Sequence, residues 1–468
     1  MSADAEAPTT GATPASRLSV GVIARYATGS LGTGGFATLP GLVLAYYLTD
    51  SLGVAALAAG VVIAAAKIWD VVIDPVIGAL TDRDLARHGS RRRLMLVGAL
   101  TLPVFFALTF AVPPALGPAV GAIWVLIAFT ITAMAFSLFQ VPYIALPAEL
   151  TPSYDERTRL LAWRVVVLTG AILLFGAGGP ALRRITGDPV TGYLVMGIVA
   201  GVVIALGMLV AVTVARRSAK PRPTAPATST RVGIREHYAA GIRALRRSAP
   251  FRALLTTFVL QALATGLMLA GAQYVATWVL HSEAAIELLF VALIAPALFA
   301  APLWGLFARR AGKERTFAIA SIVFAGAALS IVVVLWVPGA WIYGPVAIAG
   351  VAYAGMQSLP MAMLPDVITH DERVSGPGQA GAFSGVWTAG ETVGFALGAT
   401  VLSIILTVTG YVSSTAGELV SQPDAAIAGI VVSFSVAPAA LIATSLISLA
   451  RYRLRRADIE DAVGSRAD

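Results

Sequence analysis

The sequence contains no cysteine, and only 12% of its 468 residues are charged. The absence of cysteine excludes disulfides, thiolate metal sites and thiol catalysis. Soluble domains carry roughly 25% charged residues, so the shortage of charge excludes an ordinary soluble protein. No Walker sequence occurs, which excludes a nucleotide-driven process within this chain. What remains is a chain dominated by apolar residues.

Apolar residues make up 57% of the chain, and its mean hydropathy is +0.82. A helix needs about 20 apolar residues to cross a bilayer. Twelve segments meet this requirement: 19–48, 55–80, 94–112, 119–146, 160–182, 190–214, 251–280, 286–308, 316–337, 340–364, 380–411 and 426–449. We therefore predict an all-α membrane protein with twelve transmembrane helices.

The basic residues alternate between the two sides of these spans. Of 33 Lys and Arg, 27 fall on the side that carries both termini, whereas the loops of the other side hold only Arg183 and Arg184. The positive-inside rule then predicts a multi-pass protein of the cell (inner or plasma) membrane with both termini in the cytoplasm. These loops also account for the net charge of +8, so we expect no nucleic acid as a partner. Residues 1–18 begin without a basic region and read as a disordered cytoplasmic tail, not as a signal peptide.

The long segment 215–250 divides the chain into a six-span half at 19–214 and another at 251–449, followed by a tail at 450–468. This segment reads as a flexible linker ending in a cytoplasmic amphipathic helix. Motifs recur in order between the halves, for example Asp155-Glu-Arg157 and Asp371-Glu-Arg373. Two parallel six-helix pseudo-repeats with a substrate site at their interface are the plan of the major facilitator fold.

Span two carries three ionisable residues on one helix face, Lys67, Asp70 and Asp74. Two carboxylates one turn apart could hold a hard cation such as sodium, or share a proton. Pro75 lacks an N–H, so the carbonyl of Val71 becomes a third free oxygen. The alternative is that Lys67 only neutralises Asp70 to fix the helix. One uncompensated negative charge favours the cation hypothesis.

Other charged residues suggest coupling, substrate binding and gating. Thr388 and Glu391 share a face near the middle of span eleven, and Glu391 is either a neutral structural acid or a coupling residue. Arg164 opens span five and either snorkels to the interface or holds a substrate. Further candidates on the cytoplasmic side, where helix ends could close by charge pairing, are Asp82, Arg83, Asp155, Arg157 and Arg309. The four histidines lie outside the spans, so no imidazole relay crosses the membrane.

These residues resemble the glycoside–pentoside–hexuronide:cation symporter family of the major facilitator superfamily. The resemblance is carried by Tyr46-Tyr47-Leu-Thr-Asp50, by Lys67-Ile-Trp-Asp70-Val-Val-Ile-Asp74-Pro75, and by Pro142-Tyr143-Ile-Ala-Leu-Pro147 with the stretch from Asp155 to Arg164. It implies that Asp70 and Asp74 bind the coupling cation and that Arg164 contacts a sugar. Tyr143 and Trp387, which lie in the motifs of spans four and eleven, are further candidates for substrate contact.

The sequence departs from the family pattern at four places. Gln140 replaces a third cation-site acid, Gly34 or Gly35 replaces a sugar-binding acid, Ile144 replaces an aromatic platform, and Glu391 replaces a lysine. Gln140 still offers an oxygen to the cation. We expect a secondary active transporter without a cofactor, not an enzyme, that couples sodium or proton entry to symport of a sugar or glycoside. The alternatives are a lysolipid or amphiphile transporter of the same family and an efflux antiporter. We expect a monomer surrounded by membrane lipids.

This topology predicts which loops a membrane-impermeant reagent reaches. Labels in the outside loops should react in intact cells, and labels in the inside loops only after permeabilisation, because the bilayer blocks the reagent. The test positions are Leu116, Gly187, Glu283 and Ala416 outside, and His88, Ala225 and Ser375 inside. The reverse pattern would contradict the predicted orientation.

Overall fold

The computed structural model describes residues 17–151, 153–215, 243, 245–375, 380–418, 420–452 and 454. The predicted tails before residue 17 and after residue 454 lie outside this part of the chain, and so does most of the predicted linker at 215–250. The division of the chain into these segments therefore stays a prediction where it concerns the linker and the tails.

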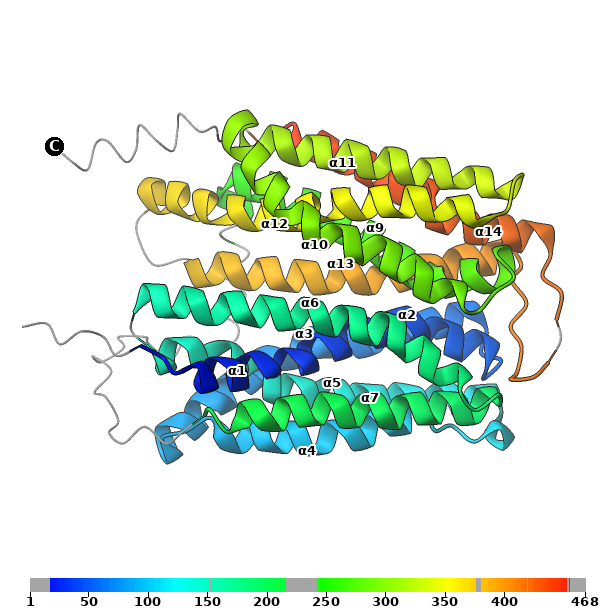
Figure 1. Ribbon diagram of the computed structural model, residues 1–468, viewed down its shortest axis with the longest axis horizontal. Coiled ribbons are helices and arrows are strands. Elements are labelled where there is room, and N and C mark those ends of the chain that lie inside the picture. The colour runs from blue at the N-terminus through cyan, green and yellow to red at the C-terminus, as the bar shows by residue number, and fades with distance from the viewer. Residues whose placement is uncertain are drawn as a thin grey trace, which may run out of the picture.

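The described chain contains twelve helical spans that are long and apolar enough to cross a membrane, as predicted (Figure 1). The first span is broken into two helices at Gly29, and the last is broken at Ser435. In chain order the helices are α1 (Val20–Thr28), α2 (Ser30–Asp50), α3 (Ala56–His88), α4 (Arg92–Thr109), η1 (Pro114–Leu116), α5 (Gly117–Leu150), α6 (Tyr154–Arg184), α7 (Pro189–Val212), α9 (Ala249–Tyr274), η2 (Val275–Val279), α10 (Ala285–Ala311), α11 (Lys313–Ser330), η3 (Ile331–Leu335), η4 (Ala340–Ile342), α12 (Tyr343–Ser375), α13 (Ala380–Val408), α14 (Asp424–Phe434) and α15 (Val436–Leu449).

Several helices extend beyond the apolar segments that predicted them. The span predicted at 55–80 would leave Asp82 and Arg83 in the following cytoplasmic loop, but α3 continues to His88 and ends only where Gly89 adopts a φ of 66°. The expectation of a loop at Arg183 and Arg184 was also wrong, because both lie in the last turn of α6. Helical hydrogen bonding does not stop where hydropathy falls, so polar residues continue a helix until a cap or a glycine ends it.

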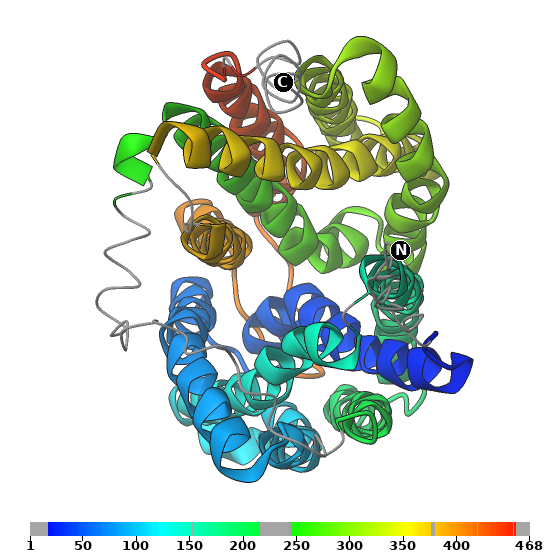
Figure 2. The ribbon, with the colours of Figure 1, turned by 90° about the vertical axis from the view of Figure 1, so that its left-hand side faces the viewer.

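The chain forms two helical bundles, α1–α7 and α9–α15, which lie side by side when seen along the helices (Figure 2). They meet mainly through the pairs α3 with α13, α6 with α10, and α2 with α9. The first helix, α1, begins and the last helix, α15, ends at one end of the helices (Figure 1), which we call the terminal end. The other end, which carries the turns at 51–55, 185–188, 280–284 and 409–423, is called the opposite end.

The two bundles repeat their chemistry at the terminal end. Ser19 caps α1 and Ser248 caps α9 through the same side-chain hydrogen bond. The residue before each cap binds an acid of its own half: the Leu18 N–H donates to Glu156 at 3.0 Å, and Arg247 pairs with Asp371.

A second pair of equivalent contacts fixes the turns between neighbouring helices. Arg91 lies 2.5 Å from Glu149 in the first half, and Lys313 lies 2.5 Å from Asp366 in the second. Because two unrelated bundles would not place equivalent contacts at equivalent positions, these pairs support the repeat inferred from the sequence.

Close helix packing depends on glycine at several crossings, and Gly350 shows how tight it is. A Cβ added at Gly350 of α12 would lie 2.0 Å from the carbonyl oxygen of Leu293 on α10. Membrane helices gain their association energy from such close backbone approach, since lipid supplies no hydrophobic drive between them.

We expect Gly350→Ala to destabilise the second half by about 1–3 kcal/mol, because the methyl group forces α10 and α12 apart. Gly344→Ala in the same helix is the control, since a Cβ there meets nothing within 4 Å. Thermal unfolding of the two purified variants in detergent would measure the difference. Equal melting temperatures would contradict this account of the crossing.

Candidate transport site

The charged face of span two lies on α3 and is completed by a serine from α5. The Ser137 hydroxyl donates to Asp70 Oδ1 at 3.0 Å and also interacts electrostatically with Asp74. Lys67 Nζ lies 3.8 Å from the other oxygen of Asp70. Within the described chain, Asp74 Oδ1 is buried and has no hydrogen-bond partner. The structure therefore brings the two predicted carboxylates together around one hydroxyl and leaves one carboxylate oxygen unsatisfied.

Lys67 also contacts residues other than Asp70. Its ammonium group lies 5.1 Å from the ring centroid of Phe36 and 5.8 Å from that of Phe129. A cation held over aromatic faces is stabilised without an acid, so Lys67 is not committed to neutralising Asp70. This arrangement leaves the pair of carboxylates with an excess of negative charge.

The remaining predicted cation ligands are oxygens of α3 and α5. Helix α3 continues through Pro75, so the carbonyl of Val71 lacks its usual helical donor. The amide oxygen of Gln140 accepts a hydrogen bond from Thr33 on α2 at 2.8 Å. Among the described residues, no group of three or more His, Cys, Asp or Glu could hold a metal ion. A cation here would thus depend on two carboxylates and on neutral oxygens.

Arg164 lies against an aromatic cluster of the first half. Its guanidinium carbon is 5.4 Å from the ring centroid of Tyr143, which stacks on Tyr26 at 4.6 Å. The Tyr143 hydroxyl donates to the carbonyl of Tyr26 at 2.9 Å and lies 3.2 Å from Ser30 Oγ. Tyr143 is fully buried, so in this conformation it supports Arg164 and does not itself form a surface for a solute. Arg164 Nε is buried without a hydrogen-bond partner among the described residues.

The two glycines that replace a sugar-binding acid are packing residues. A Cβ at Gly34 would lie 2.7 Å from Ala171 of α6, and one at Gly35 would lie 2.7 Å from Ile204 of α7. Neither position has room for a side chain. The more open face of α2 runs instead through Thr33, Ala37 and Gly41, between Gln140 of the first half and Leu269 of the second.

The predicted residues of span eleven lie on different sides of α13. Trp387 is buried and stacks on Phe258 of α9 at 4.3 Å between ring centroids. Thr388 is exposed and donates to the carbonyl of Ser384 at 3.1 Å. Glu391 is half-buried within electrostatic reach of Tyr353 on α12. Because α13 packs on α3, Glu391 and the two aspartates lie on facing helices, and their coupling stays a prediction.

The predicted gate residues are spread over the terminal end. Arg83 is exposed at the end of α3, and Arg157 donates to the carbonyl of Thr151 at 3.2 Å. Arg309 lies on the rim of a cavity of about 660 Å³ between α10, α11 and α12. The side chains of Asp82 and Asp155 lie outside the described part of the structure. The gating role of these five residues stays a prediction.

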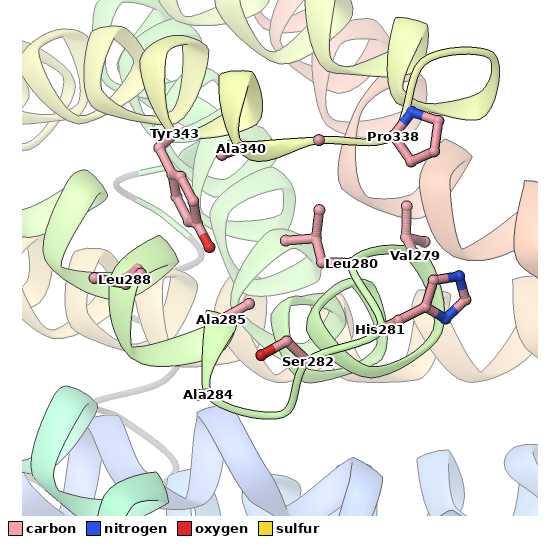
Figure 3. A pocket seen from close by; sticks show the side chains of 11 residues that line it. Val279, Leu280, His281, Ser282, Ala284, Ala285, Leu288, Pro338, Ala340 and Tyr343 are labelled. Atoms are coloured by element: carbon pink, nitrogen blue, oxygen red, sulfur yellow. The ribbon is translucent and has the colours of Figure 1, made fainter.

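A second cavity lies at the opposite end of the second half. It has a volume of about 440 Å³ and is bounded by the turn after η2 and by the start of α12 (Figure 3). His281 and Ser282 line it together with mostly apolar residues. None of the predicted site residues contributes to it, so it is separate from the candidate transport site.

The sequence analysis missed a set of ion pairs that joins the halves at the opposite end. Arg183 donates to Glu283 at 2.8 Å and to the hydroxyl of Tyr193 at 2.7 Å, and Arg184 pairs with Glu287. A signal was present, because Arg183 and Arg184 are the two basic residues that the sequence assigned to the outside loops. Glu283, in the turn before α10, and Glu287, in the first turn of α10, lie four residues apart.

Comparisons with known proteins show the family and the fold of this chain. The family model described as MFS/sugar transport protein matches residues 25–456. The putative glycoside/cation symporter YagG of Escherichia coli is 26% identical over 433 residues, which cover 89% of this chain and 88% of that protein. The sodium-dependent lysophosphatidylcholine symporter 1 of Mus musculus is 24% identical over 78% of this chain and 73% of that protein. The crystal structure of a D-xylose–proton symporter superposes with a TM-score of 0.68 at 14% identity, covering 92% of this chain and 97% of that one, which shows the same fold.

The packing of α2 predicts where a carboxylate can be introduced. Gly34→Asp should lower the yield of folded protein severely, because its side chain collides with α6. Ala37→Asp should fold, because residue 37 lies on the open face of α2. Size-exclusion chromatography of fluorescently tagged variants measures both outcomes. A well-folded Gly34→Asp would show that α2 and α6 are less tightly packed than described.

Proposed function

Because the chain belongs to the MFS/sugar transport protein family, we propose that it is a cation-coupled symporter that imports a sugar or glycoside by alternating access. The observation that carries the proposal is the arrangement of Asp70, Asp74 and Ser137, with one unsatisfied carboxylate oxygen inside the membrane-spanning region. Ionisable groups at such a depth are costly and mark ion pathways.

The terminal end is the cytoplasmic end in this proposal. The excess of basic residues on that side supports the assignment through the positive-inside rule. The halves are joined at the opposite end by Arg183, Arg184 and their acidic partners. The conformation is then one that is closed toward the outside.

Coupling follows from the charge balance on α3. When empty, the site holds two carboxylates one turn apart, and their repulsion opposes tight packing of α3 against α5. A sodium ion or a proton removes that repulsion, and Ser137 then adds a neutral oxygen between the two acids. Closure of the halves is therefore favoured only after the cation has bound. Thermodynamic linkage requires that the solute and the cation strengthen each other's binding.

Arg164 is the proposed anchor of the solute. Its guanidinium group offers several donors in a fixed plane, which suits hydroxyl and carboxylate groups of sugars. The stacked rings of Tyr143 and Tyr26 support one face of the Arg164 guanidinium group and fix its orientation. Since α2 has no room for an acid at Gly34 or Gly35, the polar contacts of the site are fewer than in the family pattern.

That loss of polar contacts favours one alternative, the transport of a lysolipid or another amphiphile. The similarity to a mouse lysophosphatidylcholine symporter supports this alternative. Uptake into proteoliposomes would distinguish a sugar or glycoside transporter from an amphiphile transporter. The measurement compares uptake of several glycosides and of lysophosphatidylcholine in the presence of a sodium gradient, a proton gradient or neither.

Asp70→Asn and Asp74→Asn should each reduce concentrative uptake at least tenfold, because the cation loses a charged ligand. Melting temperatures should stay near that of the unmodified protein. Asp424→Asn is the control, since that carboxylate is exposed at the start of α14. Gradient-driven accumulation by either α3 variant would refute the cation site.

A further inference from the structure

The turn between α13 and α14 crosses to the first half and pairs with it as a strand would. The N–H of Ser414 donates to the carbonyl of Thr49 at 2.9 Å, and the N–H of Ala416 donates to that of Ser51 at 3.1 Å. Leu52 and Thr415 form an antiparallel bridge between these bonds. We call residues 409–418 the strap. Its backbone joins the two halves directly, beside the ion pairs of Arg183 and Arg184.

The strap is held in shape by side chains of the same turn. Gln422, four residues beyond the strap, bonds both polar groups of the Val412 backbone, at 3.0 and 2.8 Å. Glu418 accepts from the backbone and the hydroxyl of Thr415, and these bonds hold the pKa of Glu418 below its usual range. Gly410 and Gly417 take up φ values of 75° and 84° at the two bends. A segment organised in this way can detach and return without losing its own fold.

A side-chain latch lies under the strap. The Tyr411 hydroxyl donates to Asp50 Oδ1 at 2.5 Å, and Trp278 Nε1 donates to the same hydroxyl at 2.8 Å. Thr49 Oγ1 lies 2.5 Å from Asp50 Oδ2 and 2.7 Å from the hydroxyl of Tyr274. Asp50 belongs to α2, whereas Tyr411, Trp278 and Tyr274 belong to the second half. The carboxylate that ends the first span therefore receives a short hydrogen bond from the other half.

We propose that the strap and the Asp50–Tyr411 pair form a latch that holds the transporter closed at the opposite end and must release once in every cycle. The requirement for release in every cycle rests on the alternating-access mechanism of the proposed function. Hydrogen bonds to a carboxylate are short and strong, and a carboxylate left buried without its donors is costly. Partial opening is therefore disfavoured. The halves either keep the latch or separate far enough for water to solvate Asp50.

Because the chain has no cysteine, a single introduced cysteine can report whether the opposite end is open or closed, without any substrate. Ser403 of α13 is buried against α3, where a Cβ at Gly60 would lie 2.6 Å from it. In a Ser403→Cys background, a membrane-impermeant maleimide added at the opposite end should react slowly. Labelling reports closure of this end even if the protein transports nothing.

Tyr411→Phe and Asp50→Asn should each raise the labelling rate of the reporter about tenfold, because each removes a hydrogen bond to a carboxylate. Tyr343→Phe, at the start of α12 and away from the latch, should leave the rate unchanged. Melting temperatures check that the variants remain folded. Unchanged labelling in both latch variants would overturn the proposal.

A covalent version of the strap gives an independent measurement. Oxidation of Leu52→Cys with Thr415→Cys should join the halves and suppress labelling of the Ser403→Cys reporter, and reduction should restore it. The matched control is Val112→Cys with Gly121→Cys, a pair in contact within the first half, which should have no effect. Failure of the first pair to form a disulfide, or full labelling while it is oxidised, would refute the latch. Suppressed labelling in a protein that moves no sugar would leave the latch standing and refute only the proposed function.

Discussion

Two carboxylates within one membrane-spanning helix set the constraint on which the rest of the first half depends. Carboxylates at this depth are costly without partners; α5 supplies the Ser137 hydroxyl to Asp70, whereas one oxygen of Asp74 has no hydrogen-bond partner among the described residues. Lys67 offsets only part of the charge, since its ammonium group also lies over two aromatic rings. The site is therefore built with a deficit of positive charge, which the proposed cation would remove.

The second half repeats the helix contacts of the first half but lacks carboxylates at the positions that correspond to Asp70 and Asp74. Arg91 with Glu149 and Lys313 with Asp366 fix equivalent turns. At the positions in α10 that correspond to Asp70 and Asp74, the chain has Ala297 and Ala301, followed by the equivalent proline Pro302. Duplication thus preserved the contacts that hold each bundle together, whereas the pair of carboxylates occurs in the first bundle, and α13 of the second contributes the single acid Glu391. This asymmetry supports the proposed cation site in the first half.

The sequence was sufficient for the number of spans and for the pairing of Asp70 with Asp74, because both depend on local periodicity. It was sufficient for the repeat because the same short motifs recur in order in the two halves. Contacts between distant segments were not accessible in that way. The burial of Tyr143 and Trp387 depends on helices far away in the chain, and so does the lack of space at Gly34 and Gly35. The ends of α3 and α6 were misplaced because hydropathy shows where a segment can lie in the membrane, whereas a helix can continue into polar residues beyond it. The strap could not be predicted because it pairs through backbone groups, which give no recognisable pattern of side chains in the sequence.

The tight fit of α2 against α6 and α7 has a mechanical consequence. With backbone and side-chain atoms where a Cβ at Gly34 or Gly35 would be, these three helices cannot slide past one another without first separating. A first half that moves as one stiff body would act as a lever, with the proposed cation site partway along α3 and Asp50 at the tip of α2. A small rotation at the proposed site would then become a larger displacement at the tip. Rigidity at two glycines would thus let an ion bound in the membrane interior act at a distant end of the protein.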